Sequence, residues 1–524
     1  MKKLFTLLLL SASYISYSQS CLPQGIIFTT QTQIDNFSSD FPGCTQILGF
    51  VNIDESLPGD ITNLNALSVL TSIEGNLVVD STFALTNLSG LDNINSIGGT
   101  LKISANTALT SLSGLDKVTS IGGGVDFNNN DALTNFSGLD NVASIGGDLY
   151  IRYNDAITNC NGLGNINSIE GNLSVYFNGA LTSISGLDNV TSIGQGFAAF
   201  YNPVLTSFSG LDKVTSIGGY VDVYNNAALT NFSGLGNVTS IGGDFTVRYN
   251  AALASLNGLD KVSSIGGGLI IGNNIALASI SALDNVTSIG GGIDISSNAA
   301  LTSLNGLDNV TSIGEILNIS SNPALTSLSA LDNVTYIGGD LTVYFNAALA
   351  SLNGLNNVSS IAGSLNISAN ASITSLSGVD NIDPSTIADL ILENSNNLTT
   401  CAVNSICDYL DNGGVASISG NATGCNSVAE VQSACSPVAA IEIGGDTGEI
   451  EVSPNPTTGL VEIAGGKTGQ TIAILRVTDV NGRLVPYDVF AENSSINLAN
   501  QPDGMYFITL KTGSQILLKR VMKN

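Results

Sequence analysis

The 524-residue sequence contains no histidine and no tryptophan. The absence of histidine excludes the Ser-His-Asp triad, the Cys-His dyad and the H-E-x-x-H zinc site, each of which needs an imidazole. Acid–base chemistry would therefore depend on paired carboxylates, as in glycosidases. Glutamate is scarce in the middle of the chain, where only Glu74, Glu170 and Glu315 occur between residues 61 and 390. We therefore expect no enzyme and no cofactor.

Positive charge is also scarce. The chain has 15 Lys and Arg against 42 Asp and Glu, a formal net charge of −27. Such an acidic protein is repelled by nucleic acid and by anionic lipid, so neither is an expected partner. Long apolar runs are missing after residue 18, and a transmembrane helix needs about 20 apolar residues. We predict no transmembrane segment in the mature protein.

Residues 1–18 have the features of a secretory signal peptide. Two lysines precede the apolar run Leu4–Leu10, and small residues follow it, ending at Ser18. A lipoprotein signal is the alternative, with Cys21 as the acylated residue, but Ser18-Gln19-Ser20 fits the required motif poorly. Both interpretations predict export.

The middle of the chain is a repeat. A small residue followed by an aliphatic one stands at Ala66-Leu67, Gly90-Leu91 and onward to Gly378-Val379, in thirteen intervals of 24 residues without an insertion. A fixed period of this length, sustained over many copies, indicates a solenoid. We predict about fourteen coils in residues 61–397.

The pattern inside one unit predicts a mainly β fold. The L-x-V segment, as at Leu77–Val79, alternates with period 2 and is typical of a strand. The rest has period 3, but its Thr, Ser, Asn and Gly spacers favour extended or 3₁₀-like turns over an α-helix. An isoleucine column, Ile73 to Ile361, precedes a glycine pair, where we expect a corner with positive φ. The predicted fold is a right-handed parallel β-solenoid of 24-residue coils.

An asparagine stands three residues after each strand, from Asn106 to Asn370. Its amide both donates and accepts, so it suits backbone groups that have no partner at a buried corner. The pattern L-x-L-x-x-N resembles the signature of leucine-rich repeats, and Cys44–Ile53 resembles the first strand of receptor L domains. The resemblance covers residues 44–398 and implies a binding scaffold, without identifying its ligand.

Seven cysteines accompany the repeat. Residues 19–60 are predicted to form an N-terminal cap with a Cys21–Cys44 disulfide, because an exported protein meets oxidising conditions. Residues 398–437 are predicted to form a C-terminal cap of two short helices around a strand. It holds two disulfides of open connectivity among Cys401, Cys407, Cys425 and Cys435; a zinc site is the alternative, but C-x-x-C spacing is absent. Cys160 lies in an apolar column and is predicted to be a core residue.

The composition changes after a predicted linker at residues 438–449. The final segment contains the sequences Ser453–Gly459, Val477–Arg483 and Pro502–Ile508 and ends with a basic strand. These elements, in this order, resemble the C-terminal sorting domain of the type IX secretion system. The resemblance implies that residues 450–524 form a small β-sandwich that the secretion machinery recognises, and that the protein is released or attached to the outer surface. The residues that carry it are Pro454, Asn455, Pro456, Gly459, Asn481, Gly482, Arg483, Gly504, Tyr506, Lys519 and Arg520.

Outward positions on the strands are mostly small or polar. So is the residue before the asparagine that recurs in each coil. In five consecutive coils they become aromatic or cationic, and stacking of the coils should gather them into one stripe. An exposed aromatic patch is typical of an interaction site, although aromatic ladders can also simply stabilise a sheet. The candidate ligand-binding residues are Tyr150, Arg152, Tyr153, Tyr176, Phe177, Phe200, Tyr201, Tyr220, Tyr224, Arg248 and Tyr249.

We predict from these features an exported protein that recognises a glycan or protein ligand in binding or adhesion. One alternative is a passive surface or ice-binding solenoid, but the L-T-S-L spacing does not place neighbouring hydroxyls on one strand face. Another is an enzyme acting on polysaccharide, which needs carboxylates clustered outside a structural column, and the sequence shows no such cluster. A column of aspartates is predicted to occupy turns, with divalent-cation binding as its alternative: Asp92, Asp116, Asp140, Asp188, Asp212, Asp260, Asp284, Asp308 and Asp332.

Overall fold

The computed structural model describes residues 19–435, 440–443, 450–465, 470–480, 483, 485–490, 495–512 and 515–524. The predicted signal peptide, residues 1–18, lies outside the described residues. The chain forms two compact units, which are described separately below. The first comprises the chain up to Leu398 together with Gly414–Ala422, and the second comprises Thr399–Gly413 and Thr423–Asn524.

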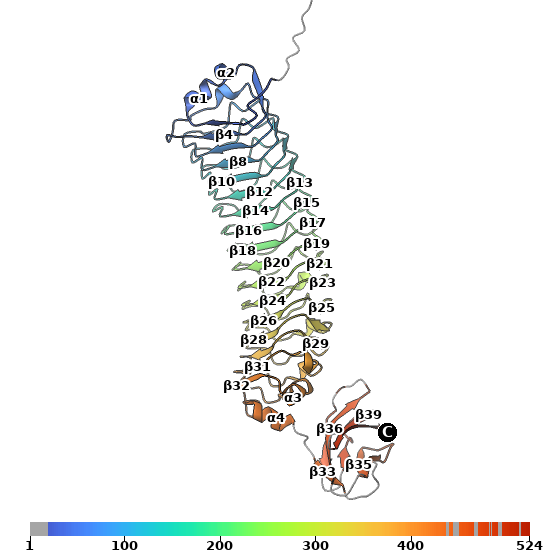
Figure 1. Cartoon of the computed structure of the whole chain (residues 1–524). Coiled ribbons are helices and arrows are strands. Elements are labelled where there is room, and N and C mark those ends of the chain that lie inside the picture. The colour runs from blue at the N-terminus through green and yellow to red at the C-terminus, as the bar shows by residue number, and fades with distance from the viewer. Residues whose placement is uncertain are drawn as a thin grey trace, which may run out of the picture. The chain divides into compact units, whose positions relative to one another are not determined.

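The first unit is the predicted parallel β-solenoid (Figure 1). Each coil contributes one strand to a 17-stranded parallel sheet. Neighbouring strands of the repeat pair at an offset of 24 residues, as Leu77 does with Leu101, and the offset is 25 or 26 at the two ends of the sheet. Below, this is the long sheet. Its strands are β2 (Ile26–Phe28), β4 (Val51–Asp54), β6 (Leu77–Asp80), β8 (Leu101–Ser104), β10 (Val125–Asn128), β12 (Leu149–Arg152), β14 (Leu173–Tyr176), β16 (Phe197–Phe200), β18 (Val221–Tyr224), β20 (Phe245–Arg248), β22 (Leu269–Gly272), β24 (Ile293–Ser296), β26 (Leu317–Ser320), β28 (Leu341–Tyr344), β30 (Leu365–Ser368), β31 (Leu390–Glu393) and β32 (Ala416–Ser419).

The isoleucine column forms a second row of strands, most of them only two residues long. One sheet contains β1 (Gln19–Cys21), β3 (Cys44–Ile47), β5 (Ser72–Ile73), β7 (Ser96–Ile97), β9 (Ser120–Ile121), β11 (Ser144–Ile145), β13 (Ser168–Ile169), β15 (Ser192–Ile193), β17 (Ser216–Ile217), β19 (Ser240–Ile241), β21 (Ser264–Ile265) and β23 (Ser288–Ile289). A second contains β25 (Ser312–Ile313), β27 (Tyr336–Ile337) and β29 (Ser360–Ile361). Short 3₁₀ turns occupy η1 (Asn65–Leu67), η2 (Ser281–Leu283), η3 (Ser329–Leu331), η4 (Ser377–Val379) and η5 (Pro384–Thr386). The period-3 side is therefore extended and 3₁₀-like, as the sequence predicts.

The twelve asparagines form a continuous buried ladder through the solenoid, in which each of them is fully buried. The Oδ1 atom of Asn130 accepts a hydrogen bond from the backbone N–H of Asn106 at 3.2 Å. Its Nδ2 atom donates to the carbonyl of Ile103 at 2.9 Å, and its own N–H donates to Oδ1 of Asn154 at 3.1 Å. Each asparagine thus joins its coil to both neighbours and satisfies backbone groups that no strand can reach.

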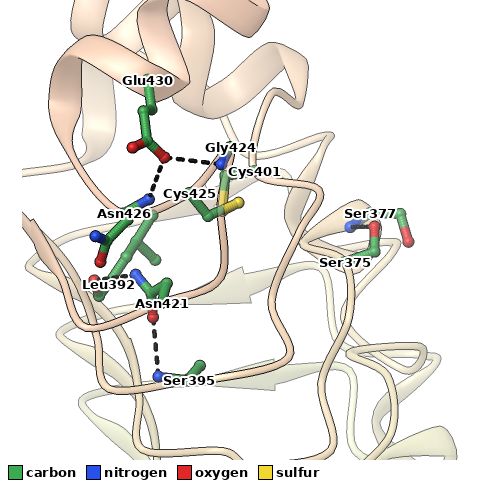
Figure 2. Close-up of a disulfide and its surroundings, with 10 residues drawn as sticks. All are labelled: Ser375, Ser377, Leu392, Ser395, Cys401, Asn421, Gly424, Cys425, Asn426 and Glu430. Atoms are coloured by element: carbon green, nitrogen blue, oxygen red, sulfur yellow. Dashed lines mark hydrogen bonds between the residues drawn. A yellow bond between two sulfur atoms is a disulfide. The ribbon is translucent and has the colours of Figure 1, made fainter.

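The ladder ends on hydroxyl residues. Thr82 donates from its backbone N–H and its hydroxyl to Asn106 at the first rung. At the other end Asn370 donates to the hydroxyl of Ser395, whose N–H in turn donates to Oδ1 of Asn421 at 2.9 Å (Figure 2). Asn421 donates to the carbonyl of Leu392, so the ladder geometry continues for one coil after the 24-residue period is lost.

The glycine pairs have a different cause from the one predicted. Gly98 and Gly122 do not have positive φ, so that prediction is wrong. A Cβ atom on Gly122 would lie 2.3 Å from the carbonyl oxygen of Gly98, because successive coils approach closely at this corner. Positive φ occurs instead at the glycine of the S-G-L turn, such as Gly114 at +112°, and at the residue after each strand, such as Tyr153 at +53°.

The segment predicted to be the N-terminal cap adds the first strands to both sheets and carries two short helices, α1 (Gln31–Asp35) and α2 (Phe37–Asp40). Phe28, Ile34 and Phe37 are buried there, and the rings of Phe28 and Phe37 meet edge to face at 5.8 Å. A disulfide joins Cys21 to Cys44. Cys160 is buried within the coils with a free thiol, and burial raises the pKa of that thiol to about 12.

In the second unit, disulfides join Cys401 to Cys425 and Cys407 to Cys435. The latter links α3 (Asn404–Asp411) to α4 (Val428–Cys435). Figure 2 shows Glu430 beside the first bridge, where it accepts hydrogen bonds from the N–H groups of Gly424 and Asn426 at 2.7 and 3.1 Å. Four cysteines are thus used in disulfides, and the zinc alternative loses its ligands.

The rest of the second unit is a β-sandwich of two antiparallel sheets. One sheet contains β33 (Ala440–Ile443), β36 (Gln470–Asp479), β39 (Gly504–Thr512) and β40 (Gln515–Lys523). The other contains β34 (Ile450–Ser453), β35 (Leu460–Gly465), β38 (Ser495–Asn497) and β37 (Asp488–Phe490). Both sheets contribute to one core, which includes Val461, Ile474 and Ile508. Residues 440–443 pair with β36, so the predicted linker is too long at that point.

Within the described residues no helix is long and apolar enough to span a bilayer.

The disulfide assignment predicts the thiol content of the purified mature protein. Three bridges consume six of the seven cysteines, so unfolding without a reductant should expose one thiol, that of Cys160. Titration with a chromogenic disulfide reagent in denaturant measures this number directly. Five or more thiols would contradict the cysteine pairing in the second unit.

The ladder predicts a large and local loss of stability when one rung is removed. Asn226→Ala leaves the N–H of Asn202 and the carbonyl of Ala199 without their partners, and each buried unsatisfied group costs about 1–3 kcal/mol. Asn237→Ala is the matched control, because its side chain also bonds to both neighbouring coils, donating to the carbonyl of Asp212 and accepting from Lys261, but is exposed. Thermal denaturation should show a large drop in melting temperature for the first variant and a small one for the second. Equal drops would show that burial of the ladder is unimportant.

Candidate ligand-binding site

The outer face of the long sheet gathers the predicted binding residues into two rows. The pairing register places the last residues of β12 to β20 directly opposite one another, in the order Arg152, Tyr176, Phe200, Tyr224, Arg248. The ring centroids of Tyr176 and Phe200 are 6.3 Å apart, and those of Phe200 and Tyr224 are 6.5 Å apart. This row is an aromatic stripe with an arginine at each end.

The second row consists of the residues that follow these strands, and it is the more exposed. The rings of Tyr153 and Phe177 are nearly parallel with centroids 4.7 Å apart, and those of Phe177 and Tyr201 are 4.5 Å apart. In the next coil Asn225 occupies the position of this row, and the ring of Tyr224 fills the gap. Its centroid lies 5.3 Å from that of Tyr201 and 5.1 Å from that of Tyr249. We call Tyr153, Phe177, Tyr201 and Tyr249 the outer aromatic row; between 38% and 46% of each residue's surface is exposed.

The outer aromatic row adopts left-handed backbone conformations. Tyr153, Phe177 and Tyr201 have φ of 53°, 57° and 54°, and Tyr249 has 61°. Apart from Phe345, the same position in the other coils holds Ser, Ala or Asn, as at Ser81, Ala105, Asn129, Asn273, Ser297, Ser321 and Ala369. A bulky side chain is disfavoured in this region by about 1 kcal/mol or more, whereas asparagine tolerates it. The sequence did not reveal this constraint, because the position was expected to vary freely.

Both arginines are ion-paired within the face. Arg152 makes two bonds to Asp126, from Nε at 3.0 Å and from the terminal nitrogen Nη2 at 2.8 Å, and it lies 5.6 Å from the ring centroid of Tyr150. The bonds to Asp126 raise the pKa of Arg152. Arg248 donates to Asp294 at 3.1 Å, and its strand neighbour in the intervening coil is Gly272. The Nε atom of Arg248 is buried and has no hydrogen-bond partner.

Tyr150 and Tyr220 cover the small residues between them. Tyr150 donates from its hydroxyl to Asp148 at 3.0 Å, and burial together with this bond raises the pKa of Tyr150 to about 12. The Tyr220 ring lies over Gly196, where a Cβ atom would be 2.5 Å from the ring. Ser174 and Ala198 occupy outward positions of β14 and β16, yet they are only 4% and 2% exposed. Tyr220 therefore packs over the sheet backbone although 40% of its own surface is exposed, and the outer aromatic row is exposed to a similar extent.

A hollow lies beside the Arg248 end of the stripe, and the sequence did not predict it. Its volume is about 450 Å³. Its floor is the glycine pairs of two successive coils, and three carboxylates lie around it, contrary to the expectation that no such cluster would be found. The lining residues are Asp244, Arg248, Gly266, Gly267, Gly268, Ile270, Gly290, Gly291, Gly292, Asp294, Glu315 and Ile316. The glycines at 268, 272 and 292, at outward positions, are the sequence signal that marks it.

A second aromatic pair was also missed. Tyr344 and Phe345 occupy the same two positions as Tyr176 and Phe177, and they are 44% and 55% exposed. Phe345 has φ of 56°, but the neighbouring coils have Ser321 and Ala369 at its position. This pair is therefore isolated and forms no row.

The aspartate column and the threonine rows have structural roles. Asp92 accepts a hydrogen bond from the N–H of Gly90 at 2.7 Å, and other members of the column repeat this bond, as Asp116 does with Gly114. Across the described residues, no group of three or more potential side-chain ligands is placed to hold a metal ion. The hydroxyl of Thr110 donates to the carbonyl of Thr86, and the same inter-coil bond recurs in later coils, for example at Thr182 and Thr206.

In the β-sandwich, most of the sequence motifs lie near one end of the β39–β40 pair, where Gly504 pairs with Lys523. Asn455 donates to the carbonyl of Arg520 at 2.8 Å and accepts from the N–H of Met522 at 2.9 Å, which fixes the Pro454–Gly459 loop to β40. The hydroxyl of Tyr506 donates to the carbonyl of Pro502. The backbone N–H of Arg483 donates to the carboxylate of Asp479. Gly504 is the first residue of β39, and Lys519 lies within β40. Asn481 and Gly482 lie outside the described residues.

Three family models match the chain. A model described as the BspA type leucine rich repeat region, in six copies, matches residues 100–227 and 167–293, and the receptor L domain model matches residues 43–135. The model for the secretion system C-terminal sorting domain matches residues 451–524. A search of curated proteins found no match.

The two repeat models describe folds that typically bind rather than catalyse, and the sorting domain directs its carrier across the outer membrane. The chain thus combines a parallel β-solenoid, parts of which match leucine-rich-repeat and receptor L domain models, with a C-terminal segment that matches the sorting domain of type IX secretion and indicates a protein secreted or anchored on the outer surface.

Proposed function

We propose that this protein is a surface or secreted binding protein whose ligand docks on the outer face of the long sheet, over the outer aromatic row. The observation that carries the proposal is the backbone conformation of that row. Four aromatic residues occupy left-handed positions within five consecutive coils, whereas the other coils have Ser, Ala or Asn there, apart from the isolated Phe345. Strain of this kind persists where a function compensates for it.

The exposure of the row supports the same proposal. Phe177 and Tyr201 each leave 38% of their surface open, and Tyr153 and Tyr249 leave more. Buried aromatic anchors dominate the free energy of many protein interfaces, and exposed clusters of them are uncommon on proteins that bind nothing.

The sorting domain supports a function outside the cell. We infer that residues 1–18 direct export and that residues 450–524 are then read by the type IX machinery. Adhesion is the specific role we favour for an anchored form. The alternative of an ice-binding face is weakened because the threonine hydroxyls already donate to neighbouring coils.

The proposal predicts that the outer aromatic row can be removed without loss of stability. In Tyr153→Asn, Phe177→Asn and Tyr201→Asn combined, each asparagine stands where Asn129 and Asn225 already do. Relief of left-handed strain, about 1 kcal/mol per residue, offsets the lost ring stacking of about 0.5–1.5 kcal/mol per pair. The melting temperature should change by a few degrees at most. Binding in a screen of glycans and extracellular proteins should fall more than tenfold.

Phe345→Asn is the matched control for this variant, since it makes the same change at the same position in a coil outside the row. It should leave binding unchanged. A triple variant that keeps full binding, or one that unfolds, would place the row among the structural elements and the ligand elsewhere.

The sorting domain predicts where a truncated protein accumulates. Strands of the β-sandwich pair only with each other, so deletion of residues 440–524 should leave the solenoid folded. Lacking its sorting signal, the truncated chain should remain in the periplasm. Cell fractionation and protease accessibility on whole cells measure where the truncated chain accumulates. Normal surface display of the truncated form would contradict the role of residues 440–524 in secretion.

A further inference from the structure

The hollow beside Arg248 gives a reason to choose between the two ligand classes, and this inference rests on the proposed function. Arg248 is both the end of the aromatic stripe and part of the wall of the hollow. The hollow begins in the coil of Tyr249, with Asp244 and Arg248, and continues over the next coils, so a ligand that covers the outer aromatic row can extend into it.

The charge of the hollow favours a cationic group. Asp244, Asp294 and Glu315 contribute three negative charges, against the single positive charge of Arg248. That arginine is already paired with Asp294. Asp244 uses only its Oδ1 atom within the fold, where it accepts from the N–H of Gly268 at 2.7 Å. The second oxygen of Asp244 and the exposed carboxylate of Glu315 remain to pair with a ligand.

The hollow also has apolar walls. Ile270 and Ile316 line it, and Ile316 is 44% exposed. An aliphatic stem that carries a cationic head can pack on such walls while its charge reaches the carboxylates.

The aromatic row itself favours a polypeptide over a sugar. Carbohydrate rings pack on the flat faces of aromatic side chains, but both faces of Phe177 are covered, by Tyr153 and by Tyr201. One face of Tyr201 is against Phe177, and Tyr224 lies close on its other side. The exposed surface of Phe177 and Tyr201 therefore consists mainly of ring edges, which suit aliphatic and aromatic side chains of a protein.

We propose that the ligand is a polypeptide segment that places a lysine or arginine side chain in the hollow and apolar side chains on the outer aromatic row. Coils are about 4.8 Å apart, so the distance from Phe177 to the hollow, four to five coils, is about 19–24 Å. An extended chain advances about 3.3 Å per residue. The basic residue should therefore stand about six or seven residues from the apolar anchor.

The test is selection of dodecapeptides from a random display library on the full mature chain, followed by fluorescence polarisation with the enriched peptides. We expect enriched sequences to combine apolar residues with a lysine or arginine at that spacing. Replacing the basic residue with glutamine, or using the variant Asp244→Asn with Glu315→Gln, should each weaken binding at least tenfold. Combining the two changes should add little, because both remove the same contact.

Asp340→Asn is the matched control, because Asp340 also accepts a hydrogen bond from the next coil, at Ser364, but does not line the hollow. It should bind the peptides like the unmodified chain. Enriched peptides without a basic residue, or equal loss in the control, would overturn the inference. Glycan binding that depends on the outer aromatic row would also overturn it while leaving the proposed function intact. If neither peptides nor glycans bind in a way that depends on the outer aromatic row, both this inference and the proposed function are wrong.

Discussion

Each buried asparagine of the ladder joins its own coil to the coil before it and the coil after it. The rest of the solenoid depends on these hydrogen bonds to both neighbours. A single 24-residue coil cannot offset the entropy of ordering its backbone with the few apolar side chains it buries. Stacking supplies the remaining contacts, but apolar packing alone tolerates slippage. The ladder does not, because an N–H of one coil must meet the side-chain oxygen of the next.

Fixed register turns sequence columns into surface rows. Residues 24 apart face each other across each strand pair, so a change confined to a few coils becomes a compact patch. The residue before the ladder asparagine is held in a left-handed conformation in every coil, which points its side chain out of the sheet. The constraint that stabilises the scaffold therefore also presents the outer aromatic row, and it does so at a conformational cost that the stacked rings only partly offset.

The sequence predicted the parts of the structure that repetition makes regular. The period, the strand at Leu77–Val79, the extended opposite side and the role of the ladder asparagine all followed from residue types at fixed spacing. The reason for the glycine pairs did not follow from the sequence, because both a close approach of two backbones and a positive φ favour glycine. The hollow could not be predicted from one column, because Asp244, Asp294 and Glu315 belong to three different columns and meet only through stacking.

The register of the ladder forces bulky aromatic residues into left-handed positions and stacks them into a row. A crystal structure of the mature chain at a resolution that defines side chains would measure this arrangement. We expect positive φ at Tyr153, Phe177 and Tyr201, with the Phe177 ring packed between the other two at about 4.5–4.7 Å. Negative φ at these residues, or rings that point apart, would contradict it.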